Sequence, residues 1–161
     1  MTRSRLVVVG CDGGPDSDEA LRFAAEEARV RGGRLVVVCA YFRPVDPDLE
    51  DFGWSDAQLQ AKALARAETA VRRALDLPRE ADLGDCDLLA AEGDPSRVLL
   101  AQAGDAAMIV IGSHAHRLLG GVFGHHTGRH LLHDVQVPVT VVPCTSRPKA
   151  ERVGARSSRR V

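Results

Sequence analysis

The sequence lacks any long hydrophobic run. Within its 161 residues, no stretch approaches the roughly 18 apolar residues that a membrane-spanning helix requires. Before Gly10 there are only four clearly apolar residues in succession, residues 6–9, which are too few for the apolar region of a signal peptide. We therefore expect a cytoplasmic protein of one domain, with no part in a membrane.

The chain also lacks the paired spacing Cys-x-x-Cys, which is typical of zinc and redox sites. Its four cysteines are scattered, and each lies in or beside an apolar run: Cys11, Cys39, Cys86 and Cys144. This pattern predicts buried, reduced thiols. Because Cys11 stands at the end of a predicted strand, a reactive thiol at that position is the alternative.

Two common catalytic motifs are absent. No phosphate loop of the form Gly-x-x-x-x-Gly-Lys-Ser/Thr occurs, and no serine or cysteine lies in a recognisable nucleophile elbow. Ser113 precedes His114, but adjacent side chains rarely point at one another, so they do not form a convincing nucleophile and base. An enzyme of either kind is therefore not expected.

The net charge of −1 conceals an asymmetry along the chain. Residues 145–161 hold six basic residues and one acidic residue, which leaves residues 1–144 clearly acidic. The basic segment has almost no apolar content, so we expect a disordered tail that follows a folded domain of residues 1–144. An acidic body without interleaved aromatic and basic residues argues against nucleic-acid binding as the main activity. The tail is either a solvated terminus, which we favour, or a contact for nucleic acid or an acidic partner.

Five apolar runs predict five strands: residues 6–9, 35–40, 87–91, 107–111 and 138–142. Helical patterns lie between these runs. The alternation predicts a doubly wound α/β domain, with a five-stranded parallel sheet in the order 3-2-1-4-5 and helices on both faces. The third run is the weakest, which indicates a strand at the edge of the sheet.

Capping residues predict where three of the helices begin. Asp16 with Glu19, and Ser55 with Gln58, have the spacing of a capping box. Asp94 precedes a proline at the first position of the next helix. In the second helix four charged residues lie largely outside the apolar stripe, and we interpret them as solvated: Arg66, Glu68, Arg72 and Arg73.

The strand order locates a candidate site. Strands 1 and 4 are neighbours whose crossovers leave in opposite directions, which opens a crevice between Asp12 and Gly112. A glycine-rich segment follows Gly112, and the N–H groups of a helix start suit an anion such as phosphate. Asp12 either accepts hydrogen bonds from an amine or a sugar hydroxyl, or structures its own turn.

Four segments in this order resemble the universal stress protein family: residues 7–28, 92–95, 109–113 and 138–143. The resemblance extends over residues 5–143. It implies the fold given above and a cytoplasmic homodimer, often paired through the last strand, which here comprises residues 138–142. It also implies a regulatory role with an unknown protein partner. Some members of the family bind ATP and others do not.

The ATP-binding members carry Gly-x-x-Gly, nine further residues, and then Gly followed by Ser or Thr, together with an acid at the end of strand 1. Gly112 and Asp12 match this pattern. In an alignment without gaps, the second glycine falls on Ala115, the third on His125 and the hydroxyl residue on His126. The resemblance therefore covers only part of the ATP motif.

A shifted alignment places Gly124 and Thr127 at the last two positions of the motif, and it requires a loop shortened by one residue and a compensating insertion. The rings of His125 and His126 would crowd a loop that wraps phosphates. When protonated, the same histidines can instead pair with a phosphate, so both interpretations stay open.

All six histidines lie between His114 and His133. On a helix from about residue 126, His126, His130 and His133 share one face, which we expect to face solvent or a partner subunit. His-x-x-x-His spacing can hold zinc or nickel, but only Asp134 is near enough to complete a ligand set. A pH-sensitive surface and plain solvated side chains are the alternatives to a metal site.

The leading hypothesis is a homodimeric regulatory module that binds an adenine nucleotide, ATP with magnesium, between Asp12, Ala40 and the loop of residues 112–127. Ala40 belongs to this set because the end of strand 2 lies beside that of strand 1, where its backbone can read the base, as the resemblance also implies. Catalysis is expected to be absent or limited to slow ATP hydrolysis. The alternative is a nucleotide-free dimeric interaction module whose cleft is filled by His125 and His126.

Overall fold

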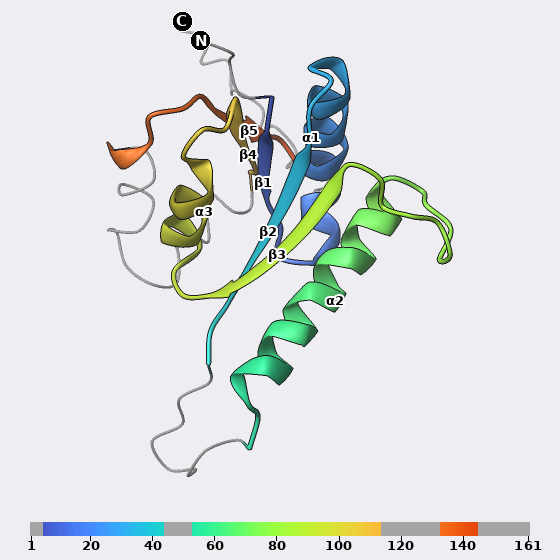
Figure 1. Cartoon of the computed structure of the whole chain (residues 1–161), viewed down its shortest axis with the longest axis vertical. Coiled ribbons are helices and arrows are strands. Elements are labelled where there is room, and N and C mark those ends of the chain that lie inside the picture. The colour runs from blue at the N-terminus through green and yellow to red at the C-terminus, as the bar shows by residue number, and fades with distance from the viewer. Residues whose placement is uncertain (1–4, 44–52, 114–132, 145–161) are drawn as a thin grey trace, which may run out of the picture.

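A computed structural model describes residues 5–43, 53–113 and 133–144. Figure 1 shows one parallel sheet in the order β3-β2-β1-β4-β5. Its strands are β1 (Val7–Gly10), β2 (Leu35–Tyr41), β3 (Cys86–Glu92), β4 (Met108–Gly112) and β5 (Val139–Val142). The predicted fold class, the strand order and the edge position of β3 are confirmed. The predicted tail lies outside the described residues, so the domain boundary at residue 144 stays a prediction.

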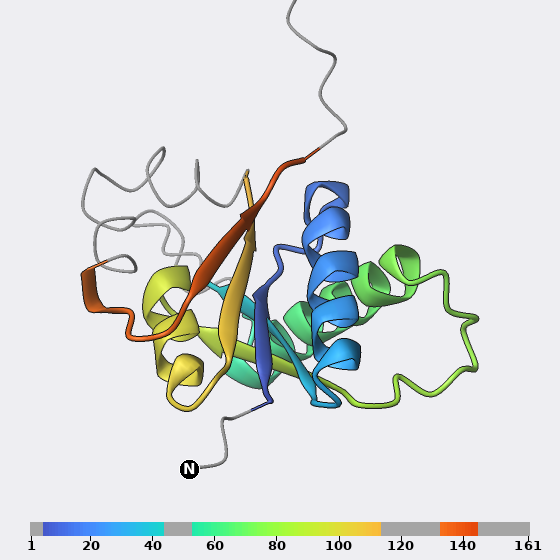
Figure 2. The ribbon, with the colours of Figure 1, turned by 90° about the horizontal axis from the view of Figure 1, so that it is seen from above.

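Helices cover both faces of the sheet. Helices α1 (Asp18–Val30) and α2 (Asp56–Ala74) lie on one face, and α3 (Pro95–Ala103) lies on the other, as Figure 2 shows. The chain moves in one direction from β1 to β2 to β3, and right-handed crossovers then place both connecting helices on the same side. The step from β3 back to β4 reverses this direction and places α3 on the opposite side.

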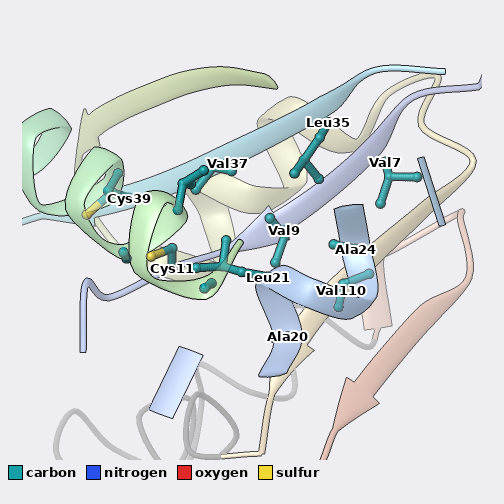
Figure 3. Packing of buried hydrophobic residues seen from close by; sticks show 14 of the residues in the cluster. Val7, Val9, Cys11, Ala20, Leu21, Ala24, Leu35, Val37, Cys39 and Val110 are labelled. Atoms are coloured by element: carbon teal, nitrogen blue, oxygen red, sulfur yellow. The ribbon is translucent and has the colours of Figure 1, made fainter. Parts of the chain in front are cut away.

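Two hydrophobic clusters form the core, one on each face of the sheet. Successive side chains of a strand point to opposite faces, so Val7 and Val9 of β1 belong to the cluster under α1 and α2, whereas Val8 belongs to the cluster under α3. Figure 3 shows Leu21 of α1 packed within the first cluster. Val7, Val8 and Val9 are all fully buried, and each such side chain contributes roughly 1.5–3 kcal/mol to folding.

Two of the predicted helix starts are confirmed. The Ser55 hydroxyl accepts a hydrogen bond from the Gln58 amide at 3.3 Å, and the Gln58 side chain accepts one from the Ser55 amide at 2.8 Å, which completes a capping box on α2. The Asp94 carboxylate accepts hydrogen bonds from the amides of Ser96 and Arg97 at the start of α3. These caps satisfy amide groups that have no partner within the helix.

The predicted capping box of Asp16 and Glu19 is wrong. Pro15–Ser17 form a short 3₁₀ turn, and α1 begins only at Asp18 without a side-chain cap. The turn is stabilised by Ser17, whose amide and hydroxyl both donate to the Gly14 carbonyl. Asp16 instead accepts a hydrogen bond from the Cys144 thiol at 3.2 Å, and therefore its carboxylate contacts the segment after β5.

Among the described residues, no helix is both long enough and apolar enough to cross a membrane.

Candidate functional site

The register of the sheet brings three predicted site residues to one edge. Gly10 of β1 pairs with Val38 of β2, and Val9 pairs with Val110 of β4. Asp12 and Ala40 each follow the first pair by two residues, and Gly112 is the last residue of β4. The carboxyl ends of β2, β1 and β4 therefore hold Ala40, Asp12 and Gly112 side by side, with Asp12 in the middle.

Asp12 combines a structural contact with exposure. Its Oδ1 accepts a hydrogen bond from the Gly14 amide at 2.8 Å, so the carboxylate does structure the turn that follows β1. The side chain is nevertheless exposed, which leaves the carboxylate accessible to a ligand as well. The two roles that the sequence left open for Asp12 are thus compatible.

Gly112 lies where the chain has little room for a side chain. A Cβ at this position would come within 3.3 Å of the Asp16 carbonyl oxygen in the 3₁₀ turn. The next residue joins the two strand ends, because the Ser113 amide donates to the Val142 carbonyl and its hydroxyl accepts from the Cys144 amide at 2.9 Å. Ser113 therefore has a structural role in fixing the exit of β4 against β5.

The remaining predicted phosphate-loop residues lie outside the described residues: Ala115, Gly124, His125, His126 and Thr127. His130 of the predicted histidine face lies outside them too. His133 is described, its side chain is 86% exposed, and its Nδ1 lies 2.8 Å from the Asp134 carboxylate. The described part of the chain contains no group of three or more histidine, cysteine or acidic residues that could hold a metal.

A cavity of about 710 Å³ adjoins this edge, between the carboxyl end of β2 and the face of α2. Its lining combines aromatic, aliphatic and basic residues: Gly13, Ala40, Tyr41, Phe42, Trp54, Leu59, Lys62, Ala65, Arg66 and Thr69. This cavity was not among the predicted sites. The signal that could have indicated it is that aromatic residues stand on both sides of residues 43–53, at Tyr41, Phe42 and Trp54, and that Lys62 and Arg66 follow in the next helix.

Two of the α2 arginines that we interpreted as solvated also bind other groups of the protein, although Arg73 is still exposed and Arg72 is partly buried. Arg73 donates from Nε and Nη2 to the Asp18 carboxylate at 2.7 to 3.1 Å, which joins α2 to the start of α1. Arg72 donates to Glu68 and to the carbonyls of Pro78 and Ala81. Arg66 is exposed, in agreement with the interpretation. Its Cβ lies close to Gly13, because a Cβ added to Gly13 would come within 3.0 Å of it.

Cys11 and Cys39 at this edge are buried, as predicted, whereas Cys86 and Cys144 are only partly buried, so the prediction of buried thiols is wrong for these two. Cys11 and Cys39 follow paired positions on neighbouring strands and face the α2 side of the sheet. Burial raises the pKa of Cys11, and its hydrogen bonds with the Ser17 hydroxyl and the Gly13 amide offset this only in part. Burial also raises the pKa of Cys39, against the opposing charge of Arg66. A raised pKa disfavours the thiolate, so the alternative of a reactive thiol at Cys11 finds no support.

The fold, together with the residues at the carboxyl ends of the strands, defines a class of protein. This class is a doubly wound α/β domain with an acid after the first strand and a glycine at the end of the fourth. Residues 4–143 match the universal stress protein family, and the chain belongs to that family. It is 32% identical over 138 residues to universal stress proteins of Mycobacterium bovis and Mycobacterium tuberculosis. These alignments cover 84% of this chain but 44% of each relative, so the chain spans less than half the length of the curated relatives it matches.

Solved structures share the same fold. A universal stress protein crystallised with cAMP superimposes with a TM-score of 0.58 at 23% identity, covering 89% of this chain and all of the other. The universal stress protein of Archaeoglobus fulgidus in complex with dAMP gives a TM-score of 0.53 at 25% identity, covering 88% of this chain and 99% of the other.

Proposed function

We propose that this chain is a regulatory module of the universal stress type that binds an adenine nucleotide at the carboxyl ends of β1 and β4. The observation that carries the proposal is the convergence of Asp12, Ala40 and Gly112 at one edge of the sheet in a member of this family. The dAMP bound by the Archaeoglobus fulgidus relative supports the adenine part of the ligand. ATP with magnesium is the ligand that the partial motif favours.

Each residue at the edge has a distinct part in this proposal. The exposed Asp12 carboxylate accepts hydrogen bonds from a ribose hydroxyl or an amine, and the backbone at Ala40 lies beside the base. The chain after Gly112, with Ala115, Gly124 and Thr127, supplies backbone amides to the phosphates. Magnesium would come with the triphosphate, because phosphate oxygens and water are its usual ligands in such complexes. ATP hydrolysis is slow or absent.

A matched pair of aspartates tests the role of Asp12. Asp82 forms the same turn before β3, where its Oδ1 accepts from the Gly84 amide at 3.2 Å, but it lies at the opposite end of the sheet. Asp12→Asn keeps an acceptor for the turn and removes the charge, and Asp82→Asn does the same at the control position. Calorimetric titration with ATP and magnesium should show binding weakened about tenfold only in Asp12→Asn. Equal affinities of the two variants would contradict the role of Asp12.

The histidines separate this function from the nucleotide-free alternative. In the proposal, protonated His125 and His126 pair with phosphate, so replacing them with Gly and Ser weakens ATP binding and removes its dependence on pH near 6.5. In the alternative, the two rings fill the cleft, and the same double replacement creates binding that the native chain lacks. The direction of the change in affinity therefore distinguishes the two functions.

The second part of the proposal is a homodimer that pairs through β5 and presents a surface to an unknown regulatory protein. β5 lies at the edge of the sheet, where only β4 pairs with it among the described strands. Val141 on this strand is 45% exposed, which is unusual for a valine in the centre of a parallel strand and suits an interface.

A further inference from the structure

The cavity beside α2 extends beyond the proposed nucleotide site. It shares Gly13 and Ala40 with that edge of the sheet, but neither Asp12 nor Gly112 lines it, and most of its lining comes from the end of β2 and from α2. Its wall on β2 comes from the α2 side of the sheet, because Tyr41 belongs to the cluster under α1 and α2, whereas the Ala40 side chain packs against the cluster under α3. We propose that this cavity is a separate binding site for a small planar aromatic molecule that carries an acid group, such as an aromatic carboxylate or sulfonate.

Aromatic side chains form one wall of the cavity. Phe42 is 51% exposed and Trp54 is 43% exposed, so both rings present apolar surface at the cavity. The Tyr41 hydroxyl donates to the Asp56 carboxylate at 2.9 Å, and this bond fixes the Tyr41 ring between β2 and the start of α2. Flat aromatic surfaces of this kind bind planar rings by stacking and edge contacts.

Two cations of α2 also line the cavity, and one of them lies against the Trp54 ring. Lys62 and Arg66 are one turn apart on α2, so they share a face of the helix. The Lys62 ammonium lies 3.1 Å from the centroid of the Trp54 ring, and the Arg66 guanidinium reaches the Cys39 sulfur at 4.0 Å. Neither has a carboxylate within 4.0 Å among the residues that the structure describes.

The other arginines of α2 give the contrast. Arg72 pairs with Glu68 and Arg73 pairs with Asp18, so carboxylates from the chain neutralise both. Of the basic residues of α2, Lys62 and Arg66, which line the cavity, have no carboxylate partner among the described residues. A guanidinium is suited to a planar carboxylate or sulfonate, with which it forms paired charge-assisted hydrogen bonds. The charge of the cavity therefore complements an anion.

Size and chemistry together define the ligand class. A volume of about 710 Å³ lies within the range of roughly 300–1,000 Å³ that is typical of small-molecule sites. The ring of the ligand packs against Phe42 and Trp54, and its acid group pairs with Arg66 and Lys62. Leu59 and Ala65 complete the apolar lining on the α2 side.

The single tryptophan makes this site directly observable. Trp54 is the only tryptophan of the chain, so its fluorescence reports on this cavity alone. The anionic probe 1-anilinonaphthalene-8-sulfonate should quench Trp54 and emit by energy transfer from it. Its neutral analogue N-phenyl-1-naphthylamine should bind about tenfold more weakly, because it cannot pair with the cations.

Three variants test the assignment, each with its fold checked by circular dichroism. Arg66→Gln removes a cation of the cavity, Ala65→Leu fills its lining, and Arg29→Gln removes the same charge from an exposed pair with Glu26 on α1. The first two should lower the affinity for the probe about tenfold, and Arg29→Gln should leave it unchanged. If all three folded variants bound the probe with the same affinity, the assignment of a binding site to this cavity would be overturned.

Competition with ATP tests whether the site is separate. Saturating ATP with magnesium should leave the probe affinity unchanged, and Arg66→Gln should leave ATP binding unchanged. Displacement of the probe by ATP, with both ligands weakened by Arg66→Gln, would overturn the separate site and assign the cavity to the nucleotide. A chain that binds the probe at Arg66 but never binds ATP would support this inference while contradicting the proposed function.

Discussion

Arg73 on α2 forms an ion pair with Asp18 at the start of α1, and two nitrogens of its guanidinium donate to the Asp18 carboxylate. Both Nε and Nη2 of Arg73 donate to the Asp18 carboxylate, whose side chain is only 12% exposed. Nη2 also lies 3.4 Å from the Gly13 carbonyl oxygen, directly after Asp12. One arginine therefore fixes the beginning of α1 and the turn that carries the predicted ligand acid.

We predict that this pair stabilises the fold measurably. Removing Arg73 leaves a largely buried carboxylate without its partner, so Arg73→Gln should lower the free energy of unfolding by about 1–2 kcal/mol, with the partial exposure of Arg73 limiting the loss. A double-mutant cycle with Asp18→Asn measures the coupling by urea unfolding. The exposed pair of Arg29 and Glu26 is the control, with an expected coupling of about 0.5 kcal/mol or less. Equal coupling in the two pairs would contradict the structural role of Asp18.

The N-cap of α3 gives a second prediction. Asp94 accepts two amide hydrogen bonds at the start of a nine-residue helix, so Asp94→Ala should lower the free energy of unfolding by about 1 kcal/mol. Asp105 is exposed just after the same helix, and Asp105→Ala should change stability by no more than about 0.5 kcal/mol. Thermal and urea unfolding of both variants provide the measurement. An equal loss in both variants would show that the cap does not stabilise α3.

The pH dependence of stability should show the partial burial of Cys86. Burial raises the pKa of this thiol from 9.0 to about 11. Between these values the unfolded chain ionises Cys86 while the folded chain keeps it neutral, so rising pH favours the unfolded state. The difference in free energy of unfolding between wild type and Cys86→Ala should be constant below pH 9. Between pH 9 and pH 11 this difference should decrease, by at most about 1.4 kcal/mol per pH unit. A difference that stays constant across this range would contradict the burial of this thiol.

A charge on β5 should separate the proposed dimer. Val141→Lys places a cation on the exposed edge strand, where two copies would bring like charges together. Val30→Lys is the matched control, since Val30 is also exposed but lies at the end of α1. Light scattering after size-exclusion chromatography should find monomers only for Val141→Lys. A dimer that tolerates Lys at position 141 as well as at position 30 would exclude β5 as its interface.

Local sequence signals were sufficient for most of the fold. The continuous valine and isoleucine runs of β1 and β4 correspond to strands buried on both faces, and the caps at Ser55 and Asp94 depend on residues two to three positions away. The start of α1 was mispredicted because Pro15 and Ser17 favour a 3₁₀ turn before the helix. Asp16 and Glu19 do have the spacing of a capping box, but the Asp16 carboxylate accepts a hydrogen bond from the Cys144 thiol instead of capping α1.

Features that depend on distant contacts could not be predicted. Asp18 and Arg73 are 55 positions apart, and nothing in the local pattern of α2 distinguishes Arg73 from a solvated arginine. The cavity beside α2 likewise needs β2, Trp54 and α2 to meet in space. At the predicted site, the register places Asp12, Ala40 and Gly112 together, whereas Ala115 to Thr127 lie outside the described residues and stay predictions.

The most direct test of the account is the nucleotide content of the protein itself. The chain is purified without added nucleotide and denatured, and the supernatant is analysed by chromatography and mass spectrometry, with calorimetric titration of ATP and magnesium on the native protein alongside. If the chain binds nucleotide at this edge, the supernatant should contain adenine nucleotide approaching about one per chain, or added ATP should give saturable heat at one site. An empty protein that gives no heat at roughly millimolar ATP would contradict nucleotide binding.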